Sequence, residues 1–172
     1  VMAIGRTFEE SILKAVRSLE IGQFDLALKD GAGMTDEWIE KRIRRAGDER
    51  LFFIGEALRR GVTVEALHEW SMIDKFFLRN LENIIKHEDV VSANPFDQET
   101  LYEAKRMGFS DVAITKLWNT KEIEIYNLRK ELDIVPVYKK VDTCAGEYES
   151  DTPYFYGTYE EENESIKSDK KS

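Results

Sequence analysis

Histidine and cysteine are the side chains best suited to nucleophilic or metal chemistry, and this chain has few of them. His68 and His87 are the two histidines, and Cys144 is the one cysteine. Zinc sites need histidine and cysteine ligands at short, paired spacings, which these three residues lack. Cys144 has no histidine near it in the sequence and lies in an extended apolar segment, which favours buried packing over nucleophilic catalysis. His68 lies beside Glu65 and Glu69 on a predicted helix and is interpreted as a half-exposed surface histidine.

Phosphate-binding patterns are also missing from the sequence. Gly31-Ala32-Gly33 is neither preceded by a strand pattern nor followed by Lys-Ser or Lys-Thr. The basic run Lys41-Arg42-Ile43-Arg44-Arg45 is typical of a solvated helix face, and Glu37 and Glu40 lie close enough to offset its charge. We therefore predict that this chain contributes no catalytic residue, no cofactor-binding residue and no metal ligand.

Four consecutive large apolar residues, Leu51, Phe52, Phe53 and Ile54, stand out on a predicted helix. On a helix they point around more than half of the circumference. Either the helix is buried in the middle of the domain, or one face packs inward and another meets a partner protein. Periodicity cannot separate these two interpretations, so the four residues are candidates for an interface.

The composition is that of a globular, acidic protein. The chain has 172 residues, of which 42% are hydrophobic and 34% charged, and it is long enough to bury one core. Its net charge of -9 argues against nucleic acid or an anionic membrane as the main partner, because both are polyanions. No apolar run approaches a membrane span, and the first residues lack the layout of a signal peptide. A single cysteine cannot form an internal disulfide, which fits a reducing cytoplasm.

Capping residues and helical spacing predict a series of helices. Thr7 and Glu10 form a capping box before an apolar face at helical spacing. A second helix is expected to begin at Thr35 or Asp36 and to stop at Gly47, and a third to run from Glu49 to Arg60 after a cap at Asp48. A short fourth helix is expected to begin at Thr63, and a long fifth to run from about Asp74 to Val91. Three more helices are expected to begin at Asp97, Ser110 and Thr120. The helical pattern stops after Val135, and the polar chain from Glu160 onward is expected to be flexible.

An internal near-repeat groups these helices. Eight residues recur at a constant offset of 47: Glu56, Ala57, Arg59, Gly61, Thr63, Leu67, Asn80 and Leu81 match Glu103, Ala104, Arg106, Gly108, Ser110, Ile114, Asn127 and Leu128. Each copy reads as helix, glycine stop, hydroxyl cap, short helix, turn and longer helix. Two such units can bury their apolar faces against each other. The sequence thus predicts an all-α fold, a compact bundle of short helices built mostly from Glu49 to Leu132. The alternative explanation of the repeat is that the same helix-turn-helix pattern recurs by chance.

The second copy, Ser110 to Leu132, also fits a helix-turn-helix pattern of DNA-binding regulators. A recognition helix beginning near Thr120 would bring Glu122 and Glu124 close to the duplex, where acidic residues are repelled. Across this segment four acidic residues cancel four basic ones. We therefore expect the motif to serve packing, with a DNA-binding regulator as the alternative function.

The tail from Val135 to Tyr159 is extended and rich in aromatic residues, and Pro136 and Pro153 exclude a helix through it. Its rings are Tyr138, Tyr148, Tyr154, Phe155, Tyr156 and Tyr159. Little in the rest of the chain looks like a strand that could pair with it. We expect these rings to pack on a surface outside this chain, which would then be part of a larger protein.

The amino-acid sequences of several segments resemble the large subunit of glutamine-hydrolysing carbamoyl phosphate synthetase. Val135 to Ala145 and Thr152 to Glu160 resemble the passage just before that protein's second synthetase half. Val1 to Ser11 and Lys14 to Glu20 resemble the last helix of its first half, and Leu51 to Gly61, Ile73 to Leu78 and Lys105 to Asp111 fit its connecting helical domain. The resemblance covers nearly all of the chain. It implies that residues 1–20 are the C-terminal helix of the carboxyphosphate-synthetic half, that residues 21–134 are the connecting and oligomerisation domain, and that residues 135–172 are an extended linker toward the carbamoyl-phosphate-synthetic half.

The resemblance also implies a function. In that family two ATP-using halves make carbamoyl phosphate from bicarbonate and ammonia, with Mg or Mn, and a small glutaminase subunit supplies the ammonia from glutamine. The product serves arginine and pyrimidine synthesis. The parent is thus a cytoplasmic, ATP-dependent carbon–nitrogen ligase. The family's nucleotide, metal and effector residues lie in other segments, so the resemblance implies a non-catalytic domain that contacts the flanking halves and self-associates, with a dimer expected.

Overall fold

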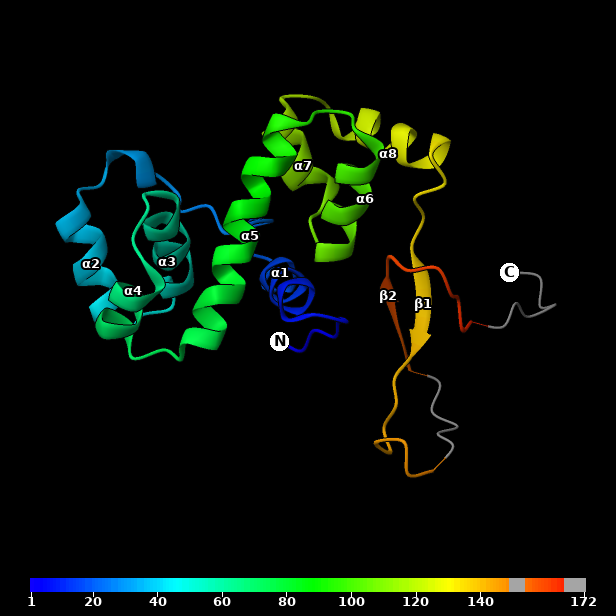
Figure 1. Cartoon of the computed structure of the whole chain (residues 1–172), viewed down its shortest axis with the longest axis horizontal. Coiled ribbons are helices and arrows are strands. Elements are labelled where there is room, and N and C mark those ends of the chain that lie inside the picture. The colour runs from blue at the N-terminus through cyan, green and yellow to red at the C-terminus, as the bar shows by residue number, and fades with distance from the viewer. Residues whose placement is uncertain (149–153, 166–172) are drawn as a thin grey trace.

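The computed structural model describes residues 1–148 and 154–165, which form helices and one small sheet (Figure 1). The helices are α1 (Phe8–Ser18), α2 (Asp36–Arg44), α3 (Arg50–Arg59), α4 (Val64–Ser71), α5 (Lys75–Ala93), α6 (Gln98–Met107), α7 (Asp111–Trp118) and α8 (Glu122–Glu131), with a 3₁₀ turn, η1 (Gly31–Gly33), before α2. The strands are β1 (Val137–Lys140) and β2 (Phe155–Thr158). The predicted helical bundle is confirmed, and among the described residues strands occur only in the tail.

Helix α5 is the central element of the bundle. It has 19 residues, and it contacts α1, α3, α4, α6 and α7. The group α2–α4 lies on one side of it and the group α6–α8 on the other (Figure 1). Its buried residues are Leu78, Leu81, Ile84, Ile85 and Val91. The apolar faces of both groups therefore share one helix, and the buried hydrophobic residues of the described part of the chain form one core.

Most helices begin where their capping residues predict. Five side chains accept a hydrogen bond from the backbone N–H three residues later: Thr7, Thr35, Thr63, Asp97 and Ser110. Asp74 opens α5 in the same way by accepting from the N–H of Phe76. These local bonds satisfy N–H groups that the helix itself leaves unpaired, which is why the sequence alone reveals them.

Three predicted boundaries are wrong. Thr120 does not cap α8: Lys121 is the N-cap residue, and the Thr120 hydroxyl donates to the Glu124 carboxylate. Asp48 does not cap α3, because Glu49 occupies that position and Asp48 only accepts from the N–H of Glu49. Helix α2 ends at Arg44, with Arg45 already extended, so Gly47 lies beyond its end.

The near-repeat in the sequence corresponds to a repeated backbone structure. Gly61 and Gly108 follow α3 and α6 with φ of 83° and 99°, and the next residue of each copy donates its N–H to an alanine carbonyl five residues earlier. The eight-residue helices α4 and α7 then end at Met72 and Asn119, both left-handed, with φ of 58° and 49°. All of these features keep the offset of 47, as do the starts of α5 and α8.

The tail pairs with itself, which contradicts the expectation that it has no strand partner in this chain. Strands β1 and β2 are antiparallel, with Val137 opposite Thr158 and Lys140 opposite Phe155. The other edge of β1 is bonded to the chain after Glu160: the N–H of Tyr138 donates to Asn163, and the N–H of Lys140 donates to Glu164. Residues expected to be flexible thus complete the hairpin, while residues 166–172 lie outside the described residues, as do residues 149–153.

The aromatic rings of the tail divide into two groups. Tyr138, Tyr148, Tyr154 and Phe155 are exposed. Tyr156 is half-buried, and Tyr159 packs against the hydrophobic core. The tail therefore uses at least one ring to attach to the helical bundle, and does not depend wholly on surfaces outside the chain.

Gly108 should tolerate alanine less well than Gly61. Both lie in the left-handed region, where a Cβ costs roughly 1–2 kcal/mol. A Cβ on Gly108 would also lie 2.9 Å from the Cα of Glu10 in α1, whereas nothing lies within 4 Å of one on Gly61. We expect Gly108→Ala to lower the free energy of unfolding by about 1–3 kcal/mol more than Gly61→Ala, as overpacking does. Urea denaturation of both variants measures this difference, and equal losses would contradict the close approach of α1 to Gly108.

Candidate interaction sites and buried polar networks

The four interface candidates of α3 lie mainly in the core. Phe52, Phe53 and Ile54 are 5%, 3% and 1% exposed, and Leu51 is half-buried against the core. The first of the two interpretations, a helix buried in the middle of the domain, therefore describes Phe52, Phe53 and Ile54. Their side chains are not available to a partner unless the bundle opens. Helix α3 is covered by α2 on one side and α5 on another, which the sequence could not show.

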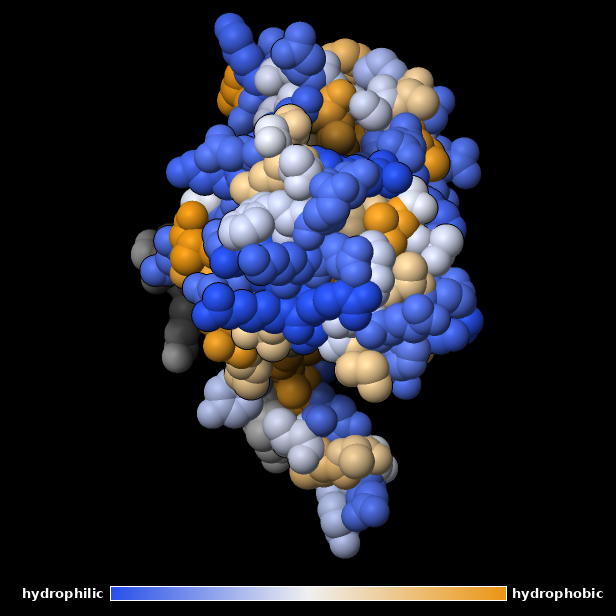
Figure 2. All heavy atoms as spheres, turned by 90° about the vertical axis from the view of Figure 1, so that its left-hand side faces the viewer, coloured by the Kyte–Doolittle hydropathy of each residue, from blue (hydrophilic) through white to orange (hydrophobic). Residues whose placement is uncertain are grey.

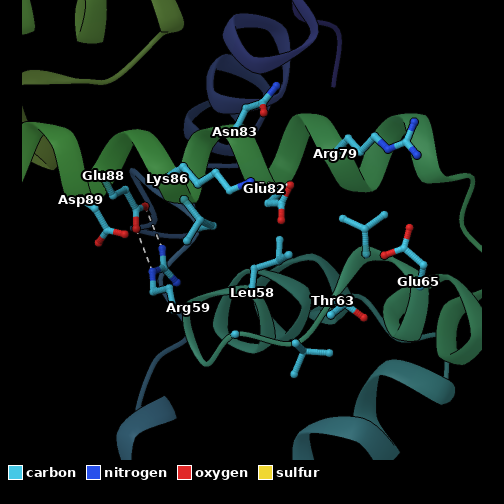
Figure 3. A pocket seen from close by; sticks show the side chains of 14 residues that line it. Leu58, Arg59, Thr63, Glu65, Arg79, Glu82, Asn83, Lys86, Glu88 and Asp89 are labelled. Atoms are coloured by element: carbon cyan, nitrogen blue, oxygen red, sulfur yellow. Dashed lines mark hydrogen bonds and ion pairs between the residues drawn. The ribbon is translucent and has the colours of Figure 1, made fainter.

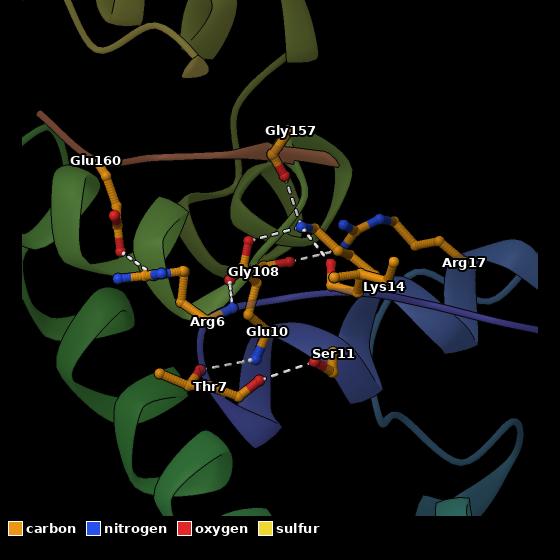
Figure 4. A network of polar contacts seen from close by, with 10 residues as sticks. Arg6, Thr7, Glu10, Ser11, Lys14, Arg17, Gly108, Gly157 and Glu160 are labelled. Carbon is orange, nitrogen blue, oxygen red and sulfur yellow. Dashed lines mark hydrogen bonds and ion pairs between the residues drawn. The ribbon is translucent and has the colours of Figure 1, made fainter. Parts of the chain in front are cut away.

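A polar network joins the start of the chain to strand β2 (Figure 4). Glu10, which is 2% exposed, accepts from the backbone N–H of Arg6 at 2.6 Å and from Nζ of Lys14 at 2.6 Å. Lys14 Nζ also donates to the carbonyl oxygens of Ile4, at 2.9 Å, and Gly157, at 2.6 Å. The three hydrogens of the ammonium group thus have three acceptors, two of which belong to segments that lie far apart in the sequence.

Arg6 adds a second link between the same segments. Its Nε lies 3.0 Å from a carboxylate oxygen of Glu160, on the outside of the network (Figure 4). The segment before α1 and the segment that includes and follows β2 therefore lie side by side. Because Glu10 is buried and Lys14 is partly buried, their ion pair contributes more to this geometry than the more exposed Arg6–Glu160 pair does.

A second network lies inside the second repeat. Lys105, 6% exposed, donates from Nζ to the carbonyl of Phe109 at 2.7 Å and to Asp111 at 2.9 Å. Arg129 donates to the other carboxylate oxygen of Asp111 at 2.7 Å. Burial lowers the pKa of the Lys105 amine against the attraction of Asp111. Burial also opposes ionisation of Asp111, but the charges of Lys105 and Arg129 outweigh it and hold the pKa of this carboxyl below its usual value.

Tyr159 attaches the tail to this second network. Its ring centroid lies 5.1 Å from Lys105 Nζ and 5.9 Å from Cζ of Arg129, within the range of cation–π contacts. Burial raises the pKa of its phenol, so the ring stays neutral at physiological pH. Sequence reasoning missed this site, although one signal was present: Lys105 stands at the core-facing position of α6, one turn after Leu101 and next to Ala104.

A hollow of about 760 Å³ lies between the α3–α4 segment and α5 (Figure 3). Glu88 binds Arg59 through two bonds of 2.8 Å at one end of it. Burial raises the pKa of Glu88, and Arg59 opposes that effect. Charges of both signs line the hollow: Arg59, Arg79 and Lys86 against Glu65, Glu82, Glu88 and Asp89. The lining has no excess of positive charge, which a phosphate ligand would require.

The remaining candidate side chains have local roles. Nδ1 of half-buried His68 lies 2.7 Å from the carbonyl oxygen of Ile73, which confirms its interpretation as a half-exposed histidine. His87 packs its ring on Phe109, with centroids 5.7 Å apart, and burial lowers its pKa. Cys144 is partly buried in a turn after β1, rather than packed in an extended segment as predicted. Within residues 1–148 and 154–165, no group of three or more His, Cys, Asp and Glu residues is arranged to hold a metal ion.

The helix-turn-helix segment is part of the bundle. In α7, Ala113, Ile114 and Trp118 are buried, and in α8 Ile125 is fully buried. The first turn of α8, which would face DNA, carries the exposed Glu122 and Glu124. These acidic residues would repel a duplex, so the structure does not favour the DNA-binding alternative. No helix in the described part of the chain has the length and apolar character needed to cross a bilayer.

Asp111→Ala should strongly destabilise the protein, because it leaves two cations without their carboxylate in a buried site. We expect a loss of about 3–5 kcal/mol in the free energy of unfolding. Glu40→Ala, which breaks the exposed pair with Arg44 on α2, is the control and should cost less than about 0.5 kcal/mol. Chemical denaturation measures both, and similar losses would show that the network is not the stabilising contact.

The same network predicts a pH dependence. The pKa of Asp111 is lower in the folded state than in the unfolded chain, so its stabilising charge is fully present above about pH 4. The contribution is lost as the pH falls through the lowered pKa. The wild type should therefore lose more stability on acidification than Asp111→Ala does, and parallel curves would contradict the assignment.

Comparison with known protein families agrees with this architecture. Residues 1–133 match the family described as the carbamoyl-phosphate synthetase large chain, oligomerisation domain. The matched region contains the eight helices of the described residues and ends before β1. It also includes the internal repeat with Gly61 and Gly108. The residues of the two polar networks that lie on helices, Glu10, Lys14, Lys105, Asp111 and Arg129, are within it as well. The match covers well over half of the 172 residues. This chain therefore belongs to the family of carbamoyl-phosphate synthetase large-chain oligomerisation domains.

Proposed function

We propose that this chain is the structural connecting and self-association domain of a carbamoyl phosphate synthetase large chain. The observation that carries the proposal is the family match over residues 1–133, which include helices α1 to α8. The tail supports it independently, because Val135 to Ala145 and Thr152 to Glu160 resemble that subunit just before its second synthetase half. On this proposal the parent enzyme makes carbamoyl phosphate from bicarbonate, glutamine-derived ammonia and two ATP, for arginine and pyrimidine synthesis.

The proposed division of labour leaves the chemistry to other parts of the parent. ATP with Mg or Mn is used in the two synthetase halves, a small glutaminase subunit supplies ammonia, and the assembly works in the cytoplasm. This chain contributes no catalytic residue. It supplies a helical body, residues 21–134, between the end of the first half, residues 1–20, and a linker, residues 135–172, that leads to the second half.

The geometry of the chain ends supports a connecting role. A domain that joins two others has to fix the direction in which the polypeptide arrives and leaves. Lys14 holds the carbonyls of Ile4 and Gly157 on one ammonium group, and Tyr159 is seated on the second repeat. The segment before α1 and the segment of β2 are thus held together on α1, and Tyr159 attaches the tail to the helical body, so that neighbouring domains would be held in a defined relative position.

The chain by itself should not bind ATP. The sequence lacks a glycine-rich phosphate loop, and the hollow between the α3–α4 segment and α5 has charges of both signs. We expect isothermal titration calorimetry with ATP and Mg²⁺ to show no binding below about 1 mM, which corresponds to about -4 kcal/mol. Titration of ATP into buffer gives the baseline. A dissociation constant in the micromolar range would contradict the proposed division of labour.

The chain should self-associate, because self-association is the role named for its family. A two-fold dimer is the commonest closed arrangement of identical chains. Sedimentation velocity over a range of concentrations should show a reversible monomer–dimer equilibrium. A duplex DNA titrated at low salt serves as the negative partner, and no complex is expected given the net charge of -9. A chain that stays monomeric at the highest concentration would contradict the proposed role.

A further inference from the structure

The hollow of the first repeat has a counterpart in the second repeat. We call the cavity of about 760 Å³ between the α3–α4 segment and α5 the first-repeat hollow (Figure 3). At the offset of 47, three of its lining residues occupy the positions of the Lys105–Asp111–Arg129 network: Leu58, Val64 and Glu82. In the second repeat this place is taken by Tyr159, whose ring centroid lies 5.1 Å from Nζ of Lys105. One copy therefore seats an aromatic side chain at the position where the other has a hollow.

The turn beside the hollow is also covered in only one copy. Gly108 is buried, and a Cβ on it would lie 2.9 Å from the Cα of Glu10 in α1. Gly61 lines the hollow and is exposed, and among the described residues nothing lies within 4 Å of a Cβ on it. The next residues follow the same pattern, because Val62 is half-buried whereas Phe109 is 2% exposed. Helix α1 and the tail thus cover a face of the second repeat that is open to solvent in the first.

The floor of the first-repeat hollow is apolar. Leu58, Val64 and Ile85 line it and are 8%, 5% and 5% exposed. Leu58 and Val64 stand where the second copy has the charged Lys105 and Asp111. A side chain placed on this floor would meet carbon atoms rather than ions, so an uncharged ring suits it. The volume is within the range of about 300–1,000 Å³ that is typical of ligand sites.

Two charges at the ends of the hollow are available to a ligand. Arg79 and Asp89 lie at opposite ends of it (Figure 3), and neither forms an ion pair within residues 1–148 and 154–165. They are ten positions apart on α5, which is about 15 Å along a helix. An extended chain rises about 3.3 Å per residue and spans this distance with about five residues. The other charges of the lining are paired within the chain: Arg59 with Glu88, Lys86 with Glu82, and Glu65 with Lys75.

We propose that the first-repeat hollow binds an extended peptide segment of a partner protein. The segment is about five residues long, with an aromatic side chain on the floor of Leu58, Val64 and Ile85. An acidic residue lies toward Arg79 and a basic residue toward Asp89. The model for this binding mode is the tail itself, in which Tyr159 directly follows the extended strand β2. The inference goes beyond the proposed connecting role and does not depend on it.

The place of the hollow favours a separate partner over a neighbouring part of the same polypeptide. The segment before α1 and the segment of β2 are held together by Lys14, and Tyr159 is seated on the second repeat. Helix α1 and the two strands lie on the side of α5 away from α3 and α4 (Figure 1). The hollow is therefore not on the side where the described chain receives these two segments.

The outer surface of the first repeat has no comparable site. The end of the molecule formed by α2–α4 is largely hydrophilic, with hydrophobic residues in separate spots (Figure 2). Trp38 on α2 is exposed, but Lys41 lies over its ring, 5.5 Å from the centroid. An apolar floor between two available charges is what distinguishes the hollow from these spots.

A synthetic peptide provides the first test. The peptide Lys-Val-Tyr-Val-Asp, blocked at both ends, carries the proposed ring and charges, and its valines favour an extended chain. Titration followed by ¹H–¹⁵N NMR should show saturable binding with a dissociation constant below about 1 mM. The amides of Gly61 and Val62 should shift, and those of Gly108 and Phe109 should not. The same peptide with Ala in place of Tyr should bind about tenfold more weakly or less, as expected for the loss of a central ring.

A change of charge provides the second test. Arg79→Glu makes both ends of the hollow acidic, so it should bind Lys-Val-Tyr-Val-Asp about two- to fivefold more weakly than the wild type does, as for an exposed ion pair. It should bind Lys-Val-Tyr-Val-Lys more tightly than the wild type does. Arg45→Glu is the matched control, because Arg45 is also exposed but lies beyond α2 and does not line the hollow. Its affinity for both peptides should equal that of the wild type.

Several outcomes would overturn the proposal. These are equal affinity for the Tyr and Ala peptides, no saturable binding by the wild type, and shifts at Gly108 and Phe109, which would mean that the peptide displaces Tyr159. Shifts at the hollow that follow protein concentration without peptide would identify a second copy as the occupant. Binding that is lost in the whole large chain of the proposed parent would identify a synthetase half. None of these results depends on ATP binding or on sedimentation, so failure here leaves the proposed function standing.

Discussion

Helix α5 is the element on which the rest of the bundle depends, because neither group of short helices can bury its apolar face alone. Helices of eight to ten residues are too short to be stable in isolation, so their helical structure requires tertiary packing. Leu78, Ile84 and Val91 are fully buried along α5 and serve both sides of the core. The loss of α5 packing would therefore remove the common support of both repeats.

Buried charge fixes what apolar packing leaves free. Apolar contacts are weakly directional. In contrast, Lys14 donates all three of its ammonium hydrogens only when Glu10, Ile4 and Gly157 lie around it in one arrangement. The Lys105–Asp111–Arg129 cluster has the same property and presents a cationic surface to the ring of Tyr159. Replacement of such ions by apolar residues often stabilises a protein, so their value here is better explained by position than by stability. Both networks locate the tail, the first through the carbonyl of Gly157 and the second through the ring of Tyr159.

The two repeats show how one backbone can serve two purposes. Gly61 and Gly108, Thr63 and Ser110, and Leu78 and Ile125 keep the same structural roles in both copies. Exposed positions have diverged, because no packing requirement holds them: Phe77 corresponds to Glu124, and Arg79 to Tyr126. In a family named for oligomerisation, such diverged surface positions are where partner contacts would be acquired without disturbance of the core.

The sequence by itself determined the features that depend on neighbours along the chain. Thr7, Thr35, Thr63, Asp97 and Ser110 cap helices through bonds to residues three positions away, and the constant offset of 47 is visible without coordinates. The resemblance of long segments to carbamoyl phosphate synthetase likewise needs only the order of residues, and the family match over residues 1–133 agrees with it.

Only the tertiary structure decided which apolar residues are interior and which charges meet. Two sets of consecutive apolar residues on helices have different surroundings. Helices α2 and α5 cover Leu51 to Ile54, whereas Phe76 and Phe77 remain largely exposed among the described residues. The pairing of β1 with β2 and the burial of Lys105 were not predicted either. Each of these depends on contacts between segments that are distant in sequence, and helical period and local hydrogen bonding carry no information about such contacts.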